Sequence, residues 1–330
     1  MNAAPETVAP PAKAAPEKIV LAAPRGYCAG VERAVQAVEA ALELYGAPVY
    51  VRKEIVHNKH VVDQLRQRGA IFVDSETEVP EDATVVFSAH GVAPTVHDNA
   101  KARRLRTVDA TCPLVTKVHV EARKFAADDY TIVLIGHDGH EEVEGTMGEA
   151  PKNIVLVQSE DDVDRLEVKD PSRMAYVSQT TLSVDETRSI INRLRRRFPQ
   201  IVGPRTDDIC YATTNRQAAV KQLARVCDLV LVIGSRNSSN SNRLVEVARE
   251  CGAESHLIDN EGQVQEEWLR DKRQIGITSG ASAPEQLVQR LVEFFRRRGT
   301  IQIEELDVIR EDVRFMLPKS IRQALAGASA

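Results

Sequence analysis

The stretch PRGYCAGVERAV at 24–35 places a cysteine directly before a helical pattern, and the same arrangement recurs in DATCPLVTKV at 109–118 and DDICYATTNRQAAV at 207–220. Each helical pattern leads into a short apolar strand, and each strand leads into a polar loop. The interval from the cysteine to the loop is 29, 28 and 29 residues, ending at His57, His140 and Ser239. Repetition at matching offsets indicates three copies of one supersecondary unit.

Two further strands follow in each unit, and the last of them again ends in polar residues. These are VVFSAHG at 85–91, MAYVSQTT at 174–181 and IGITSGAS at 275–282. Strands that alternate with helices predict parallel α/β sheets flanked by helices. Ligands of such sheets bind beyond the carboxyl ends of the strands. We therefore predict three similar α/β units around a pseudo-threefold axis, with the cysteines and polar loops meeting in a central pocket.

The repeats also suggest where each unit begins and ends. We expect units at 18–112, 113–209 and 210–300, a disordered Ala/Pro-rich tail at 1–17 and a C-terminal extension at 301–330. The first strand, KIVLAAP, could instead complete the third sheet. The two β-like runs after residue 300 have no obvious place in the repeat.

Composition argues against several classes of protein. With a formal net charge of −5, the chain lacks the excess of basic residues that is typical of a nucleic-acid binder. No apolar run reaches the roughly 18 residues of a membrane helix, and residues 1–17 lack the apolar core of a secretory signal. Five widely spaced cysteines do not form a disulfide framework. We expect a cytoplasmic protein that uses its cysteines for ligation or reactivity.

Cys28, Cys112 and Cys210 occupy equivalent loop-to-helix junctions, where a helix N-terminus favours a thiolate. Cys227 and Cys251 have no counterparts in the other units and are interpreted as structural. Three thiolates could bind zinc, but structural zinc sites use four protein ligands. They also suit an iron–sulfur cluster, and three ligands to a 4Fe–4S cube leave one iron free for a substrate oxygen. Without a C-x-x-C motif, the sequence leaves the metal open.

The polar loops favour an anionic ligand. Their hydrogen-bonding side chains are His57, His90, His140, Thr180, Ser238, Ser239, Asn240 and Ser282. Imidazole and hydroxyl donors near helix N-termini suit a phosphate or diphosphate. The histidines among them end equivalent strands, whereas His119 and the remaining histidines have no such support. Glu142 lies in the loop of His140, where it could relay a proton if burial raises its pKa, or belong to a solvated acidic turn with Glu141 and Glu144.

Nine motifs, taken in order, extend this pattern over residues 18–317. They are PRGYCAGVERAV, EIVHNKHVV, FSAHGV, DATCPLVTKVH, GHDGHEEVEGTMG, SQTTLSVDET, DDICYATTNRQ, GSRNSSNSNRL and TSGASAP. Together they resemble the family of 4-hydroxy-3-methylbut-2-enyl diphosphate reductases, which perform the last step of the non-mevalonate isoprenoid pathway. The resemblance implies three α/β units around a pseudo-threefold axis.

The resemblance also implies roles for individual residues. Cys28, Cys112 and Cys210 would hold a 4Fe–4S cluster, whose fourth iron lacks a protein ligand and can be lost to leave a 3Fe–4S cluster or none. The substrate diphosphate would be bound by His57, His90, His140, Ser238, Ser239, Asn240 and Ser282. Glu142 would relay a proton, assisted by Thr180 near the substrate hydroxyl.

The implied reaction is a two-electron reductive dehydroxylation that gives isopentenyl and dimethylallyl diphosphate plus water. Electrons would come from a ferredoxin or flavodoxin, since no G-x-G-x-x-G fingerprint is present for direct use of NAD(P)H. Two alternatives remain open at this point. One is a redox-inactive hydrolase or isomerase of a phosphorylated metabolite, and the other is a non-enzymatic cluster protein that senses iron or oxygen.

Overall fold

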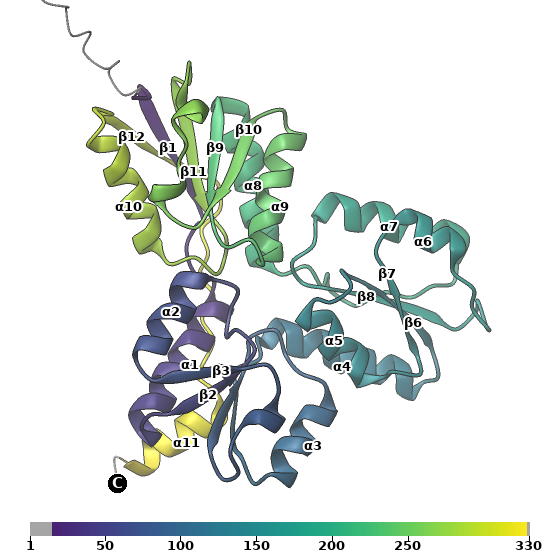
Figure 1. Cartoon of the computed structure of the whole chain (residues 1–330). Coiled ribbons are helices and arrows are strands. Elements are labelled where there is room, and N and C mark those ends of the chain that lie inside the picture. Colours follow the sequence, from purple (N-terminus) through teal and green to yellow (C-terminus); the bar gives the residue numbers. More distant parts are fainter. Residues whose placement is uncertain (1–14, 329–330) are drawn as a thin grey trace, which may run out of the picture.

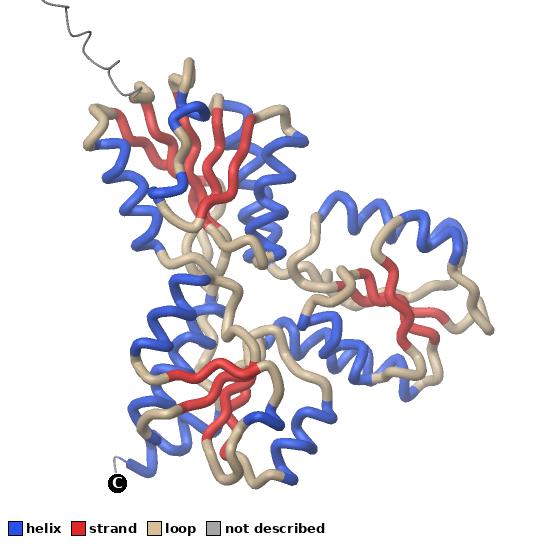
Figure 2. Tube along the Cα trace, in the orientation of Figure 1, coloured by secondary structure: helices blue, strands red, loops and turns tan. Residues whose placement is uncertain are grey.

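The structure is a computed structural model that describes residues 15–328, so most of the tail predicted at 1–17 lies outside the described residues. Figure 1 shows three lobes that meet at the centre of the molecule. Each lobe contains one sheet with helices packed on its faces (Figure 2).

The first lobe is built on a four-stranded parallel sheet. Its strands are β2 (Val49–Arg52), β3 (Ala70–Val73), β4 (Thr84–Phe87) and β5 (Arg106–Asp109). Its helices are α1 (Ala29–Tyr45), α2 (Lys59–Gln67) and α3 (Pro94–Ala102). The strands run in the order β3-β2-β4-β5.

The second lobe has a three-stranded parallel sheet. Its strands are β6 (Thr131–Ile135), β7 (Ile154–Val157) and β8 (Met174–Ser178). Its helices are α4 (Pro113–Ala127), α5 (Glu141–Glu149), α6 (Glu160–Arg165) and α7 (Val184–Arg197). The order is β7-β6-β8.

The third lobe has a five-stranded parallel sheet. Its strands are β9 (Leu229–Ile233), β10 (Glu254–Ile258), β11 (Gln274–Ser279), β1 (Lys18–Ala23) and β12 (Gln302–Asp307). Its helices are α8 (Tyr211–Val226), α9 (Ser239–Glu250) and α10 (Glu285–Arg296). The order is β10-β9-β11-β1-β12. All three sheets therefore share one arrangement, in which the first strand after the cysteine helix lies between the second and the third: β3-β2-β4, β7-β6-β8 and β10-β9-β11.

The chain links the three lobes by the same kind of connection each time, and the connection before the first lobe comes from the third. The strand before each cysteine completes the sheet of the preceding lobe: β5 pairs with β4, and β1 pairs with β11. Before Cys210, Val202 forms a parallel bridge to Ala175 of β8. This arrangement carries each cysteine from the sheet of one lobe to the first helix of the next, and so to the centre.

Two of the expected boundaries differ from this arrangement. β1 belongs to the third sheet rather than to a first unit beginning at residue 18, because its apolar side chains complete the two cores of the third lobe. The segment expected as an extension at 301–330 contributes β12 to the same sheet and then α11 (Lys319–Ala328), which packs on α1 in the first lobe.

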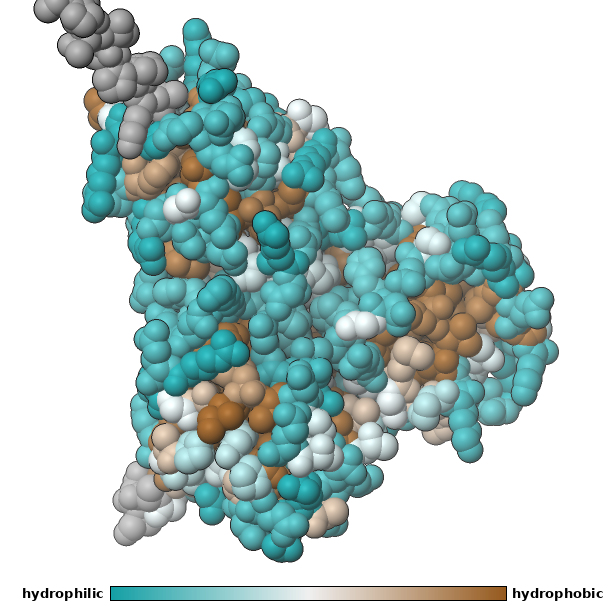
Figure 3. Space-filling model, in the orientation of Figure 1, coloured by the Kyte–Doolittle hydropathy of each residue, from teal (hydrophilic) through white to brown (hydrophobic). Residues whose placement is uncertain are grey.

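The cores follow from strands that are apolar on both faces, as expected for parallel sheets covered by helices. In β1, Ile19 and Leu21 pack in the core of α10, whereas Val20 and Ala22 pack in the core of α8 and α9. The face shown in Figure 3 is largely hydrophilic, with apolar side chains visible over the sheet of the second lobe. Among the described residues, none of the helices combines the length and apolar character needed to span a bilayer.

Candidate functional site

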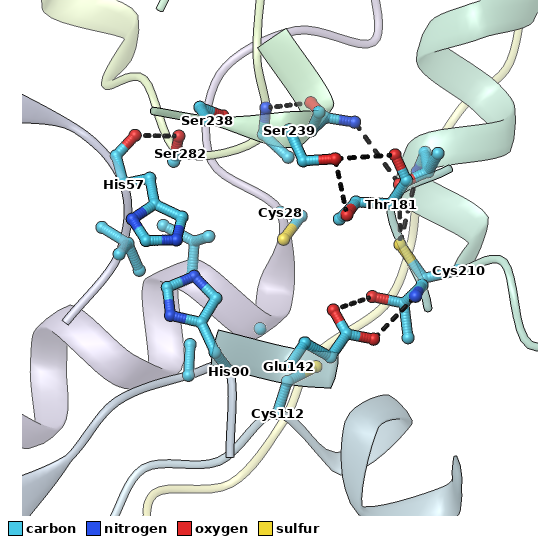
Figure 4. Close-up of a pocket in the computed structure, with 18 of the residues that line it drawn as sticks. Cys28, His57, His90, Cys112, Glu142, Thr181, Cys210, Ser238, Ser239 and Ser282 are labelled. Atoms are coloured by element: carbon cyan, nitrogen blue, oxygen red, sulfur yellow. Dashed lines mark hydrogen bonds between the residues drawn. The ribbon is translucent and has the colours of Figure 1, made fainter. Parts of the chain in front are cut away.

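The three cysteines are the N-cap residues of α1, α4 and α8, the first helix of each lobe. Their side chains line a single central pocket (Figure 4). All the site residues predicted from the sequence line the same pocket: Cys28, Cys112, Cys210, His57, His90, His140, Glu142, Thr180, Ser238, Ser239, Asn240 and Ser282. Residues from all three lobes are therefore brought together, as the repeat predicted.

The cysteine triad is closely packed at its centre. A methyl group at Gly30 would lie 2.7 Å from the Cys112 Sγ and 3.8 Å from the Cys28 Sγ, so any side chain at this position would collide with the Cys112 sulfur. Burial, together with the nearby Cys28, raises the pKa of Cys112 to about 12 and that of Cys210 to about 11. A soft cation shared by the three sulfurs would stabilise their thiolate forms, so this donor set fits a thiolate-ligated metal group.

Glu142 and Thr180 form a buried pair beside the triad. The Thr180 backbone N–H donates to Glu142 Oε1 at 2.6 Å, and the Thr180 hydroxyl donates to Oε2 at 3.1 Å. Glu142 is 2% exposed, and this burial raises its pKa to about 7 despite the two hydrogen bonds. A carboxyl group with this pKa can give up and regain a proton near neutral pH. The alternative of a solvated acidic turn is wrong for Glu142.

The three histidines form one wall of the pocket. The rings of His57 and His90 stack with their centroids 4.1 Å apart, and the ring of His140 meets both edge-on. Burial and the neighbouring His90 lower the pKa of both His57 and His140, that of His140 to about 3. His140 Nδ1 accepts the backbone N–H of Glu142 at 3.1 Å, which leaves its Nε2 to carry the proton.

A carboxylate orients each of the two stacked imidazoles. Glu54 Oε2 lies 3.3 Å from His57 Nδ1, and Glu141 Oε2 lies 3.0 Å from His90 Nδ1. Burial raises the pKa of Glu141, but the hydrogen bond with His90 outweighs it and holds that pKa below its usual value. Each imidazole therefore presents its Nε2 as the free ring nitrogen.

The N-terminus of α9 and the loop after β11 supply the short polar side chains of the pocket. Ser238 is the N-cap residue of α9 and accepts the Ser241 N–H at 3.3 Å. Ser239 Oγ accepts from the Thr181 hydroxyl at 3.2 Å. Asn240 Oδ1 accepts the Ala281 N–H at 2.9 Å, and the Ser282 hydroxyl donates to the backbone oxygen of His57 at 3.0 Å. Ser238 and Ser239 place hydroxyl groups at the positive end of a helix, which suits an anionic group.

Sequence reasoning missed several residues that support this site. Glu54 and Glu141 were not assigned as partners of the histidines, although each lies within three residues of an assigned position. Thr213 was also missed: its hydroxyl lies 3.2 Å from Cys210 Sγ, and its N–H donates to that sulfur at 3.4 Å. The spacing of three residues from an N-cap is the signal that could have identified it.

His119, which had no functional support in the sequence, is buried beside the site. Its Nδ1 lies 2.8 Å from Glu149 Oε1, and its ring packs against the backbone positions of Gly91 and Gly145. These glycines adjoin the His90 loop and the helix of Glu142. His119 is therefore part of the packing that supports the pocket.

The fold and the site define a three-lobed α/β protein with three cysteines at its centre and a polar pocket beside them. Residues 19–296 match the LytB protein family, and the chain belongs to that family. It is 59% identical over 307 residues to a 4-hydroxy-3-methylbut-2-enyl diphosphate reductase of Nocardia farcinica, covering 93% of this chain and 91% of that protein. It is 60% identical over 308 residues to a protein of the same name from Cutibacterium acnes, covering 93% and 95%.

Solved structures of reductases with similar names agree with this family assignment. The E-1-hydroxy-2-methyl-but-2-enyl-4-diphosphate reductase of Plasmodium falciparum superposes with a TM-score of 0.93 at 37% identity, over 96% of this chain and all of that one. A second structure, described as (E)-4-hydroxy-3-methyl-but-2-enyl diphosphate reductase, the terminal enzyme of the non-mevalonate pathway, superposes with a TM-score of 0.62 at 30% identity, over 85% of this chain and 99% of that one. The predicted family and the three-unit fold are confirmed.

Proposed function

We propose that this protein reduces 4-hydroxy-3-methylbut-2-enyl diphosphate. In this reaction, two electrons and two protons replace the allylic hydroxyl with hydrogen and release water. The products are isopentenyl diphosphate and dimethylallyl diphosphate, depending on which end of the allyl group receives the second proton. The observation that carries this proposal is the convergence of three cysteines, a buried Glu142 and three histidines in one pocket. The names of the relatives support the choice of substrate.

Cys28, Cys112 and Cys210 would hold the proposed 4Fe–4S cluster, leaving one iron without a protein ligand. When bound, the cluster would supply single electrons and Lewis-acid character at that iron. The protein's part is to keep the three thiolates at the pocket floor and to separate them from bulk water. Cys112 and Cys210 are suited to this because their thiols are enclosed by the helix N-termini of two lobes.

The diphosphate would lie between the histidine wall and the α9 loop. His140 offers Nε2–H, and His57 can take up a proton as the anion approaches, because a nearby negative charge raises the pKa of an imidazole. His90 presents its Nε2 beside them. Ser238, Ser239 and Asn240 at the start of α9, and Ser282 beside His57, would donate further hydrogen bonds. This arrangement fixes the anionic end and leaves the hydroxyl end of the substrate near the cysteines.

Glu142 would deliver the proton that leaves with the hydroxyl as water. Its carboxyl group is protonated in a substantial fraction of molecules near pH 7, because burial disfavours the carboxylate. Thr180 holds the carboxyl group through two hydrogen bonds, so the proton is presented from a fixed position. We retain a ferredoxin or flavodoxin as the expected electron donor, and a cytoplasmic location stays an expectation from cysteine usage.

The proposal is tested by anaerobic purification of the parent and of Cys112→Ser, followed by iron and sulfide analysis and a turnover assay with dithionite. We expect close to four irons and four sulfides per parent chain, a brown colour that Cys112→Ser lacks, and conversion of the substrate to the two isomeric diphosphates. A colourless parent after anaerobic reconstitution, or one carrying stoichiometric zinc, would favour a redox-inactive hydrolase. A brown parent that binds the diphosphate without turnover would favour a sensor.

A further inference from the structure

The cysteine triad has a second side, away from the substrate pocket, and one continuous segment crosses it. We call residues 308–318 the C-terminal strap. It leaves β12 in the third lobe and ends at α11 beside α1 of the first lobe, as the yellow trace in Figure 1 shows. The strap therefore spans the region where the cysteine-bearing loops meet.

Two sets of contacts tie the strap to those loops. Glu311 forms an ion pair at 3.0 Å with Arg216, a fully buried residue of the Cys210 helix that also donates to the backbone oxygen of Gly26. Arg33 of the Cys28 helix donates to the backbone oxygens of Met316 and Thr111, both at 2.9 Å. Thr111 directly precedes Cys112, so the strap is linked to all three cysteine segments.

A groove of about 750 Å³ runs between the strap and the triad. Residues 27–32 separate it from the substrate pocket: Cys28, Gly30 and Val31 line the pocket, whereas Tyr27, Ala29 and Glu32 line the groove. Tyr211, which follows Cys210, also lines the groove, and its hydroxyl accepts the Ala29 N–H at 3.1 Å. The groove thus comes within one residue of two of the three cysteines without entering the substrate pocket.

The exposed side chains of the strap, some of which line the mouth of this groove, have the composition of a protein interface. Ile309, Val313 and Met316 are 42%, 38% and 71% exposed, three large apolar side chains within eight residues. Arg310 and Arg314 alternate with them, are exposed, and form no ion pair within residues 15–328. Arginine and methionine are enriched at interfaces, and clustered exposed apolar side chains on a polar surface mark contact sites.

We infer that the C-terminal strap is the docking surface for a protein electron carrier, and that Arg310 and Arg314 bind carboxylates on that carrier. This inference rests on the proposed function, which requires electrons from outside the chain. Electron transfer slows steeply with distance, so a carrier must approach the triad closely. The strap side permits that approach while the pocket holds substrate.

The charged residues of the strap and the groove also limit the kind of interface that an electron carrier can form there. Glu311 is paired with Arg216, but Glu32 and Asp307 are exposed around the same groove, and Asp312 is exposed on the strap. The surface is therefore mixed rather than uniformly basic. A small, transient interface with an apolar centre and two arginine contacts fits it, as is usual for redox encounters, which lie at the low end of interface size.

The test compares a protein carrier with a small reductant, using the anaerobic holoenzyme. The variants are the double substitution Arg310→Glu with Arg314→Glu and the uncharged Met316→Gln. Lys169→Glu with Arg196→Glu, two exposed cations of the second lobe, is the control for the same change in net charge. A reduced flavodoxin or ferredoxin and dithionite serve as alternative electron sources.

We expect the double arginine variant to raise the KM for the protein carrier at least about 10-fold. Met316→Gln should raise it about 3-fold, and the control should leave it within about 2-fold of the parent value. Turnover with dithionite and iron content should be unchanged in all three. If the arginine variant and the control respond equally to the carrier, the strap is not the docking surface. If the parent itself fails to turn over with dithionite, the proposed function is what fails.

Discussion

The two sides of the cysteine triad are constructed in different ways. The pocket side is assembled from short side chains that come from loops of all three lobes, and their hydrogen bonds join groups that can gain or lose protons. The strap side is one continuous segment fixed by a buried ion pair and backbone contacts. Each reacting side chain of the pocket must be placed individually, whereas the strap needs only to be held against the cysteine segments. Substitutions on the two sides should therefore have separable effects.

Glu142→Gln should have the largest effect, and it should act on turnover alone. Glutamine preserves the shape and can still accept from Thr180, but it has no proton to give near neutral pH. We expect kcat to fall at least about 100-fold while iron content and diphosphate binding remain. Glu144→Gln, an exposed residue of the same helix, is the matched control and should behave as the parent. Near-normal turnover of Glu142→Gln would rule out the proton-relay role.

Glu311→Gln should have the opposite profile, because it weakens the strap side without touching the pocket. Arg216 is fully buried, so loss of its ionic partner leaves an uncompensated charge that costs about 3 kcal/mol of stability. We expect faster loss of iron on exposure to air and a lower thermal midpoint, with the KM for substrate unchanged in freshly loaded enzyme. Asp312→Asn, the exposed neighbour, is the control. Equal iron retention in the two variants would contradict a clamping role for the pair.

Much of the pocket side could be predicted from the sequence, whereas the strap side could not. The repeat fixes the cysteines and the strand-end residues at equivalent positions, and parallel strands deliver their carboxyl ends to one edge. The partners Glu54, Glu141 and Thr213 were missed because they lie at neighbouring positions whose side-chain directions depend on the folded helix ends.

The strap lies outside the repeat, so periodicity says nothing about its path. Its contacts link residues 95 and 283 positions apart, as in Glu311 with Arg216 and Met316 with Arg33. The position of β1 shows the same limit: its apolar alternation predicts a strand but does not specify which sheet it joins. Only the geometry of the assembled lobes decides these long-range partners.

The pH dependence of Glu142 offers a test of its burial. Its pKa is raised to about 7, so between the unfolded pKa and that value the folded protein holds a proton that the unfolded chain has lost. The stability contributed by the protonated form is complete below about pH 4 and is lost as the pH rises through 7. Relative to Glu142→Gln, the parent should lose about 3 kcal/mol or less between pH 5 and 8. Urea midpoints of both proteins at the two pH values measure this, and parallel changes would place Glu142 in a solvated setting.

Ser239→Ala should have the smallest effect and should still separate the two sides. The Ser239 hydroxyl accepts from Thr181 and faces the pocket, but it is half-buried, so its removal leaves no fully enclosed group without a partner. Loss of one hydrogen bond to the diphosphate costs about 1 kcal/mol, which corresponds to a 5-fold rise in KM. Because the anionic end is bound alike before and during the reaction, kcat should be nearly unchanged. The KM for the electron carrier should not move, since the strap lies on the other side of the triad. A parallel rise in both KM values would mean that the two sides are coupled through the triad.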